Sequence, residues 1–129
     1  MSIAVPFYDK LMPLLGFDPK KRVDAVIESH DFHVVEYSDP LLCFAITSPR
    51  GAFVDDAICR RKPGALHHLA FRADSPEEVD SLYHKLKEIG ANIVTKPKLY
   101  PEYSPWYYAV FFKDLEGIKY EVVYDQHAD

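Results

Sequence analysis

The chain has 129 residues, which is enough for one domain with a real core and short for two independent domains. Its hydrophobic content of 48% and charged content of 27% are typical of a soluble globular protein and exclude bulk disorder. The formal net charge of −5 argues against nucleic-acid binding, which needs a positive surface, so no nucleic-acid partner is expected.

Targeting and redox signals are absent from the sequence. No apolar run approaches the roughly 20 residues that cross a bilayer, so no membrane partner is expected. The N-terminus lacks the basic flank and apolar core of a signal peptide. Cys43 and Cys59 are too few for a disulfide framework, and we interpret them as reduced thiols of a cytoplasmic protein.

The first half of the chain predicts one helix followed by three strands. Residues 3–15 have apolar side chains at helical spacing, and Gly16 follows as a stop signal. Strand-like segments then occupy residues 23–27, 32–37 and 42–47. A loop rich in proline, glycine and charge follows at residues 50–63. The predicted order before this connector is α-β-β-β.

The second half predicts a strand, a helix and three more strands. Residues 65–73 are apolar enough for a buried strand. Ser75 is the expected N-cap of a helix, with Pro76 at its first position, Glu78 completing a capping box and Gly90 ending it. Strands are expected at residues 91–95, 106–112 and 118–124. The order β-α-β-β-β matches the first half, except that the first half lacks an opening strand.

Four pieces of sequence together carry a family resemblance. They are Phe7-Tyr8, the Leu-Leu-Gly-Phe run at residues 14–17, the His-Leu-Ala-Phe run at residues 68–71, and residues 113–121. In this order they resemble the vicinal oxygen chelate superfamily, which includes glyoxalase I, bleomycin-resistance proteins, fosfomycin-resistance enzymes and extradiol dioxygenases. Residues 113–121 look like the family's "DPDG…E" ending, with Leu115 in place of its proline. The resemblance covers nearly the whole chain.

The resemblance implies an α+β fold in which two paired βαβββ modules form a curved mixed sheet around a cup. Carried onto this chain, residues 1–49 are a first module without its opening strand, residues 50–63 a connector, and residues 64–129 a second module. All 129 residues then form a single domain. Either the native protein begins further upstream, or a second subunit covers the exposed sheet edge. We expect a homodimer, as is common in this superfamily.

In that family, each module offers up to two metal ligands, from its first and fourth strands. By this resemblance, His68 and Glu121 match the two ligands of the second module. The first module has no strand before Phe7 and no good donor in residues 44–47. The implied cofactor is therefore a divalent metal (zinc, nickel, manganese or iron) with an incomplete ligand set, completed by a partner chain or by the substrate's oxygens. No organic cofactor is expected.

Each candidate ligand has a structural alternative. His68 is either a metal ligand or a histidine satisfied by a hydrogen bond inside the cup. Glu121 either faces the cup with His68 or lies exposed on an edge strand, paired with Lys119 or Arg72. His67 is expected on the opposite side from His68 or in a hydrogen bond, because successive strand residues alternate faces.

Further residues are candidates for substrate binding. Five aromatic side chains lie in a proline-flanked segment and could line the mouth of the pocket. Tyr100, Tyr103, Trp106 and Tyr108 are the substrate-binding candidates, and Tyr107 is the fifth aromatic residue of the segment. The alternative is aromatic packing at a module boundary. Arg72 could neutralise an anionic ligand, since its even offset from His68 permits the same face; otherwise it is a surface residue.

Two functional hypotheses follow from the resemblance. The first is a metal-dependent enzyme of lyase, isomerase or transferase type that acts on a small oxygen-bearing substrate. Glu121 would then be both ligand and proton carrier. The incomplete ligand set supports dioxygenase-type ring cleavage least. The second is a non-catalytic small-molecule binding protein of the bleomycin-resistance type, favoured by the aromatic segment and the missing first-module ligands. The sequence leaves open whether the protein is an enzyme.

Overall fold

The computed structural model describes residues 1–59 and 61–126, in two compact units, Met1–Ala57 and Ile58–Asp129. The boundary between the units falls in the expected connector, of which residue 60 lies outside the described residues, as do residues 127–129 of the expected second module. The single domain and the joining of both modules around a cup stay predictions. No helix in the described ranges has the length and apolar character needed to span a bilayer.

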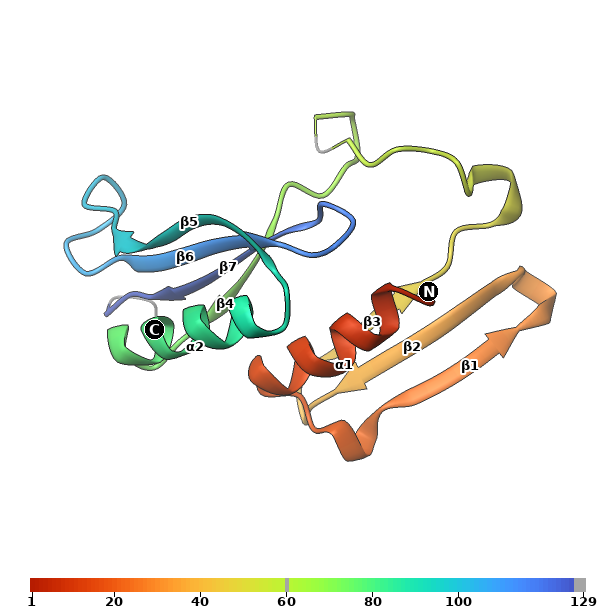
Figure 1. Ribbon diagram of the computed structural model, residues 1–129, viewed down its shortest axis with the longest axis horizontal. Helices are drawn as coiled ribbons and strands as arrows, with labels where there is room; N and C mark the ends of the chain where they lie inside the picture. The colour runs from red at the N-terminus through yellow and green to blue at the C-terminus, as the bar shows by residue number, and fades with distance from the viewer. Residues whose placement is uncertain (60, 127–129) are drawn as a thin grey trace. The chain divides into compact units, whose positions relative to one another are not determined.

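The first unit is a helix on a three-stranded antiparallel sheet (Figure 1). Helix α1 (Ala4–Leu14) is followed by strands β1 (Val23–Ile27), β2 (Phe32–Ser38) and β3 (Cys43–Thr47), paired in the order β1-β2-β3. The predicted α-β-β-β order is confirmed. The ring of Tyr8 on α1 stacks on Phe44 of β3, with 6.0 Å between ring centroids. Apolar burial therefore joins α1 to one face of this sheet.

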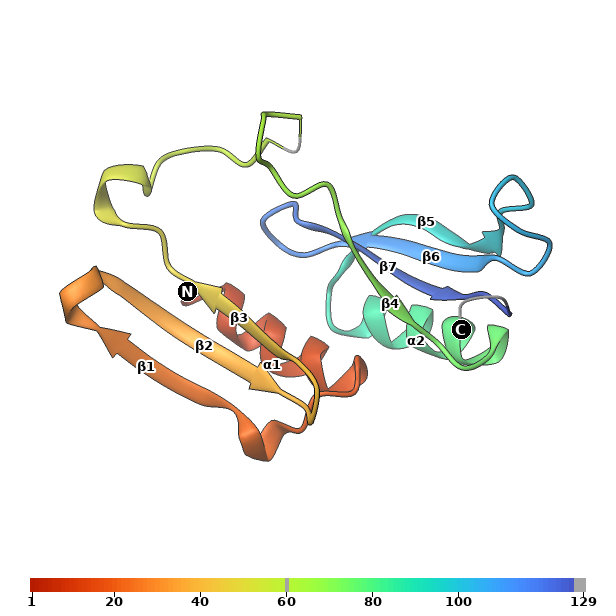
Figure 2. The same cartoon turned by 180° about the vertical axis from the view of Figure 1, so that it is seen from behind.

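The second unit has the predicted β-α-β-β-β order. Strand β4 (Leu69–Arg72) precedes helix α2 (Pro76–Glu88), and strands β5 (Asn92–Leu99), β6 (Tyr108–Lys113) and β7 (Lys119–Tyr124) follow. The sheet order is β4-β7-β6-β5, with β4 and β7 parallel and the other pairs antiparallel, as the view from behind also shows (Figure 2). With mixed pairing in this unit and helices in both units, the fold class is α+β, as predicted.

Helix α2 covers one face of the second sheet and leaves the other open. Ser75 Oγ accepts a hydrogen bond from the backbone N–H of Glu78 at 3.1 Å, which gives the predicted N-cap. The buried side of the helix consists of Val79, Leu82 and Leu86. Residues Tyr120 and Val122 of β7 are buried, and strand alternation puts them on the opposite face from Glu121. Glu121 therefore lies on the open face of the sheet, together with the residues that pair with it in the adjacent strands.

The predicted opening strand is too long. Residues 65–73 were expected as a strand, but the ladder between β4 and β7 begins at the pair Leu69–Tyr120 and ends at Arg72–Val123. Residues 65–68 have no ladder partner and are extended coil, so His68 lies immediately before the strand. At the other edge of the sheet, β5 continues past Pro97 to Leu99, because register shifts accommodate a residue without an N–H.

A tight turn between β6 and β7 sets the register of the open face. Asp114 is only 2% exposed, and its Oδ1 accepts the backbone N–H groups of Glu116 at 2.9 Å and Ile118 at 2.8 Å. Gly117 has φ of +97°, a conformation that glycine adopts without strain. The resulting pairing places Phe111 directly opposite Glu121. The chemistry of the turn therefore decides which β6 residue meets the carboxylate.

We predict that Asp114→Ala lowers the free energy of unfolding by about 2–3 kcal/mol, because two backbone N–H groups of the turn lose a buried, charged acceptor. Urea-induced unfolding at neutral pH measures this loss. Glu116→Ala, which removes an exposed side chain from the same turn, is the matched control and should change stability by less than about 0.5 kcal/mol. Equal effects of the two substitutions would contradict the role given to Asp114.

Candidate functional site

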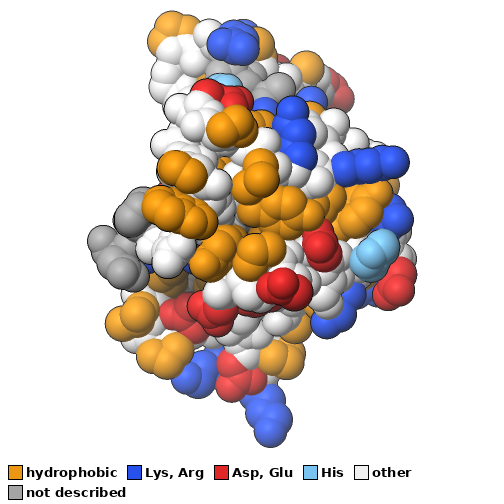
Figure 3. Space-filling view, turned by 90° about the vertical axis from the view of Figure 1, so that its left-hand side faces the viewer, with side chains coloured by type: hydrophobic (Ala, Val, Ile, Leu, Met, Phe, Trp, Pro, Cys, Tyr) orange, Lys and Arg blue, Asp and Glu red, His pale blue; other side chains and the backbone are white. Residues whose placement is uncertain are grey.

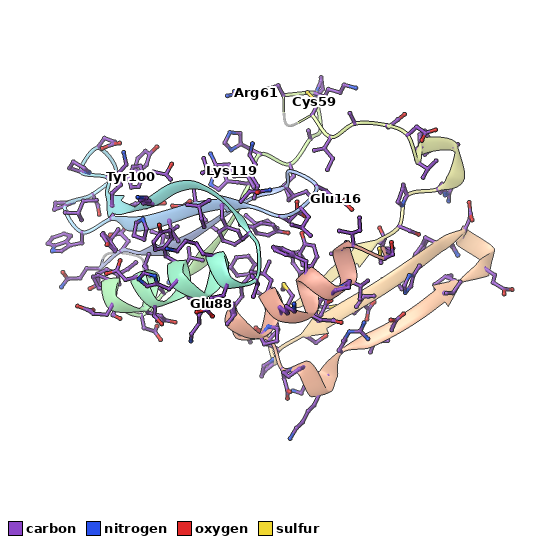
Figure 4. The ribbon with its side chains drawn as sticks, viewed as in Figure 1. Cys59, Arg61, Glu88, Tyr100, Glu116 and Lys119 are labelled. Carbon is purple, nitrogen blue, oxygen red and sulfur yellow. The ribbon has the colours of Figure 1, made fainter. Side chains whose placement is uncertain are left out.

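A pocket of about 460 Å³ opens on the face of the second sheet that α2 does not cover. Figure 4 shows Tyr100 and Lys119 on this side of the sheet, and Glu88 of α2 on the other side. The pocket is lined by His67, His68, Tyr103, Tyr107, Phe111, Lys119 and Glu121. All of these residues belong to the second unit.

Glu121 is a carboxylate buried in a central strand. It is 2% exposed and lies in β7, between Phe111 of β6 and Ala70 of β4. The hydroxyl of Tyr107 donates a hydrogen bond to Oε1. The Nε2 atom of His68 lies 3.2 Å from Oε2. Each carboxylate oxygen therefore has a partner, as a buried charge requires.

The structure thus brings together the two residues that the sequence analysis named as metal ligands. His68 and Glu121 are 53 positions apart in the chain and form a direct contact in the pocket. The hydrogen-bonded arrangement also matches the structural alternative for His68. The alternative for Glu121, an exposed residue of an edge strand, is wrong, because β7 is paired on both sides and Glu121 is buried.

His67 shares the pocket with His68, contrary to the prediction that the two face opposite sides. The prediction assumed strand alternation, but both residues precede the first ladder pair of β4. Their Nδ1 atoms lie 2.7 Å apart, so one ring donates a hydrogen bond to the other. If neutral His68 donates from Nε2 to Glu121, its Nδ1 accepts from His67. A hydrogen-bonded series then runs from His67 through His68 to Glu121.

The aromatic wall of the pocket comes from β6 and the loop before it. Tyr103, Tyr107 and Phe111 line the cavity, and Tyr100 stacks on Tyr103 with 5.8 Å between ring centroids. Tyr100 also meets Phe111 edge-to-face at 5.6 Å. Tyr100 therefore supports the wall from outside the cavity lining. Figure 3 views the molecule from the side of this loop and shows hydrophobic side chains gathered there.

Three predicted substrate-binding residues are not brought to this pocket. Tyr108 pairs opposite Tyr124, and its hydroxyl donates to Asp80 of α2 at 2.6 Å, so it lies on the helix side of the sheet. Trp106 is 39% exposed and does not line the cavity. Arg72 lies opposite Val123 on the same face as Glu121, but beyond the pocket lining. Of the four aromatic candidates, only Tyr103 lines the cavity directly.

Phe111 and Lys119 are pocket residues that were not among the sequence-based candidates. The signal for both was the 114–117 turn, which pairs Lys113 with Lys119 and hence Phe111 with Glu121. Tyr107 belongs to the aromatic segment that was expected to line the pocket, but its hydrogen bond to Glu121 could not be foreseen, because Tyr107 precedes β6 and its direction depends on the loop. In the first unit, His33 and Glu36 of β2 point to opposite faces of the sheet, and His33 Nε2 contacts Asp24 Oδ1 at 2.5 Å.

Burial and the neighbouring carboxylate keep the phenol of Tyr107 protonated. The pKa of Tyr107 is raised well above its ordinary value, first by burial and then by its hydrogen bond to Glu121 and by the negative charge of that residue. The pKa of Tyr100 is also raised, mainly by burial. At neutral pH, Tyr107 is therefore a hydrogen-bond donor that holds Oε1 of Glu121 in place.

The sequence profile of the Glyoxalase/Bleomycin resistance protein/Dioxygenase superfamily matches residues 1–122 of this chain. The chain belongs to this superfamily. Among curated proteins, none is similar enough to match the chain. Members of the superfamily bind small molecules, often bind metals and often form dimers.

Solved structures of the superfamily have the same fold. A protein from Bacillus halodurans assigned as a glyoxalase is 30% identical, with a TM-score of 0.69; the match covers 95% of this chain and 86% of that one. A glyoxylase/bleomycin resistance protein/dioxygenase domain from a Frankia species is 21% identical, with a TM-score of 0.74. That match covers 98% of this chain and 89% of the Frankia chain. The latter likeness concerns the fold alone.

His68 and Glu121 fit part of a metal site. An imidazole nitrogen and a carboxylate oxygen are common ligands of zinc, nickel, manganese and iron. Two ligands on one tetrahedral zinc ion, each about 2.1 Å from it, lie roughly 3.4 Å apart, and His68 Nε2 and Glu121 Oε2 are separated by 3.2 Å. Within residues 1–59 and 61–126, no three His, Cys, Asp or Glu side chains are grouped to hold an ion. The pair therefore fits two positions of a coordination shell and leaves the others to be supplied.

We predict that Tyr107→Phe makes stability less sensitive to alkaline pH. Because the folded-state pKa of Tyr107 is raised, the phenol binds a proton in the native state above pH ~10, where the unfolded chain has lost it. The free energy of unfolding therefore falls as pH rises above that point, by up to about 1.4 kcal/mol per pH unit for this one group. Urea unfolding from pH 8 upward should show a smaller fall in Tyr107→Phe.

Tyr103→Phe is the control for this experiment, because it removes a hydroxyl from a tyrosine that is 65% exposed in the same loop. Identical pH dependence in the wild type and in Tyr107→Phe would show that folding does not raise the pKa of Tyr107.

Proposed function

We propose that the protein is a metal-dependent enzyme that acts on a small oxygen-bearing molecule in the pocket of the second unit. The observation that carries this proposal is the 3.2 Å contact between His68 Nε2 and Glu121 Oε2 inside an aromatic-walled cavity. A nitrogen atom and an oxygen atom that can both bind a metal come from distant parts of the chain and meet beside a cavity that can hold a small molecule. A divalent ion held there supplies a positive charge that stabilises negative charge developing on substrate oxygens.

The residues around the pair are arranged to support this role. For His68 to offer Nε2 as a ligand, its proton must sit on Nδ1, and His67 Nδ1 lies 2.7 Å away to accept the hydrogen bond. Such a partner on the second ring nitrogen orients a ligating histidine. The hydroxyl of Tyr107 fixes Oε1 of Glu121, which directs Oε2 towards His68. Tyr107 and His67 are thus positioning residues in this proposal.

Glu121 also has the geometry of a proton carrier. Among the described residues, it is the one carboxylate that lines the pocket, and its Oε2 lies 3.2 Å from His68 Nε2. Tyr103, Tyr107 and Phe111 form a partly apolar wall, which limits water around the carboxylate. Proton transfer next to a polarised oxygen is common to isomerase, lyase and transferase reactions on this fold, and the residues do not choose among them.

The incomplete ligand set favours a second candidate, a non-catalytic binding protein of the bleomycin-resistance type. Both oxygens of Glu121 are already hydrogen-bonded, and only two metal-donor side chains meet directly at this contact. In this function, the His68–Glu121 pair is a structural part of the cavity floor. The aromatic wall then provides the binding energy for the ligand.

We also propose that the protein is a homodimer in the cytoplasm. In the described part of the first unit, β3 pairs with β2 on one side and with no strand on the other. In the second unit, the last strand, β7, is paired on both sides. A second copy that covers the edge of β3 would remove an aggregation hazard.

We predict that the purified protein binds one divalent ion per chain and that His68→Ala weakens this binding at least tenfold, as does Glu121→Gln. The alanine removes the only nitrogen ligand of the pair, and the amide replaces a charged oxygen by a neutral one. Isothermal titration with zinc, nickel and manganese, together with metal analysis of the purified protein, measures the effect. The matched control is His84→Ala, an exposed histidine of α2 on the other side of the sheet.

Unchanged metal affinity in His68→Ala would remove the pair from the metal site. A protein that binds no ion but retains tight binding of a small ligand in the cavity would instead establish the binding-protein function.

A further inference from the structure

The open face of the second sheet has a positive charge in a chain whose net charge is −5. Strand register places Arg72, Lys98, Lys113 and Lys119 on the same face as Glu121. The face therefore has four cationic side chains in its strands and one carboxylate. Of these four cations, Lys119 lines the pocket, and its positive charge favours an anion there over a cation.

Two of these lysines are held directly opposite each other. Lys113 and Lys119 are the pair nearest the turn between β6 and β7. Like charges at directly opposed positions of an antiparallel ladder destabilise it. An anionic group close to both ammonium groups would offset this repulsion. The pairing therefore puts two lysines at neighbouring positions near the Lys119 end of the pocket.

Lys119 is the cation that reaches the pocket itself. It lines the cavity with His67, and its Nζ lies 4.8 Å from the centre of the Phe111 ring. Glu121 does not offer an equivalent negative charge to a ligand. It is 2% exposed, and its oxygens accept hydrogen bonds from Tyr107 and contact His68. Lys119 is therefore a cation of the cavity lining, whereas the carboxylate of Glu121 is buried and already has partners.

The remaining wall is aromatic and suits a flat ring. Tyr103 and Tyr107 meet edge-to-face, with 5.1 Å between centroids, and Phe111 forms the floor between Lys119 and the loop. Aromatic rings pack on such surfaces in stacked or edge-to-face geometry. A volume of about 460 Å³ is large enough for a single substituted ring.

We infer that the ligand of this pocket is a small aromatic anion, with its ring against Tyr103 and Phe111 and its anionic oxygens at Lys119. The inference names the ligand class of the pocket on which the proposed function rests. It applies equally to an enzyme substrate and to a sequestered ligand. It does not depend on a metal ion, because Lys119 and the aromatic wall belong to the chain itself.

Three probes of similar size test the inference. Salicylate is an aromatic anion, salicylamide is its neutral counterpart, and cyclohexanecarboxylate is an anion without an aromatic ring. Binding to the full-length, metal-free chain at low ionic strength is followed by amide chemical shifts in NMR titrations, which also report where each probe binds. Salicylate should bind at least tenfold more tightly than either of the other probes and should shift the amides of Phe111, Lys119 and Glu121.

A charge variant and its control identify the cation. Lys119→Gln should reduce the affinity for salicylate at least tenfold and bring it close to that for salicylamide. Lys85→Gln removes the same charge from an exposed position on α2 and should leave both affinities unchanged. Circular dichroism and urea unfolding of both variants confirm that the fold is retained.

The outcomes separate the inference from the proposed function. Pocket shifts with equal affinity for salicylate and salicylamide, or preference for a cationic ring such as benzylamine, overturn the inference and leave the pocket as a ligand site. An unchanged preference for salicylate in Lys119→Gln also overturns it. If none of the probes shifts the pocket amides, the inference fails, whereas metal binding by His68 and Glu121 is decided by the titration of the metal alone.

Discussion

The second unit depends on one buried charge and the donors that it requires. Glu121 lies in β7, the strand that pairs with both β4 and β6, and it is 2% exposed. A carboxylate at such a position is costly unless hydrogen-bond donors reach it. The residues that pair with Glu121 in the neighbouring strands, Phe111 and Ala70, are apolar and have no side-chain donor to offer it. Both donors come instead from irregular segments that flank the sheet, His68 before β4 and Tyr107 before β6.

This requirement explains why two coil segments are positioned as firmly as the strands. The 100–107 loop is closed by a backbone hydrogen bond from Tyr100 N–H to the carbonyl of Tyr107 at 2.8 Å. Ser104 Oγ donates to Asp125 Oδ1 at 2.8 Å and ties the same loop to the end of β7. The loop thereby delivers Tyr107 to Glu121 and brings Tyr103 with it to the pocket wall. The same contacts therefore stabilise the fold and fix the geometry of the site.

The sequence was a good guide to elements and a weaker guide to loops. Helix α2 was readable because its cap and apolar spacing are local, and strand Val23–Ile27 because its boundaries are marked by polar residues. Residues 65–68 were assigned wrongly to a strand, because a strand ends where its ladder partner ends and β7 is far away in sequence. Tyr107 and Tyr108 are adjacent and chemically alike, yet one holds Glu121 and the other bonds to Asp80 on the helix side. Only the loop conformation distinguishes them.

The metal and the anion that we propose are not independent ligands. In the described part of the second unit, Glu121 is the only carboxylate that lines the pocket, and Lys119 lines it too. A divalent ion at His68 and Glu121 adds positive charge to a cavity that already favours an anion, so anion affinity rises when the ion is bound. Thermodynamic linkage requires the anion to strengthen metal binding by the same factor. An anionic ligand with suitable oxygens can also occupy coordination positions that the chain leaves open. A site with two protein ligands is then weak for the ion alone and stronger when both ligands are present.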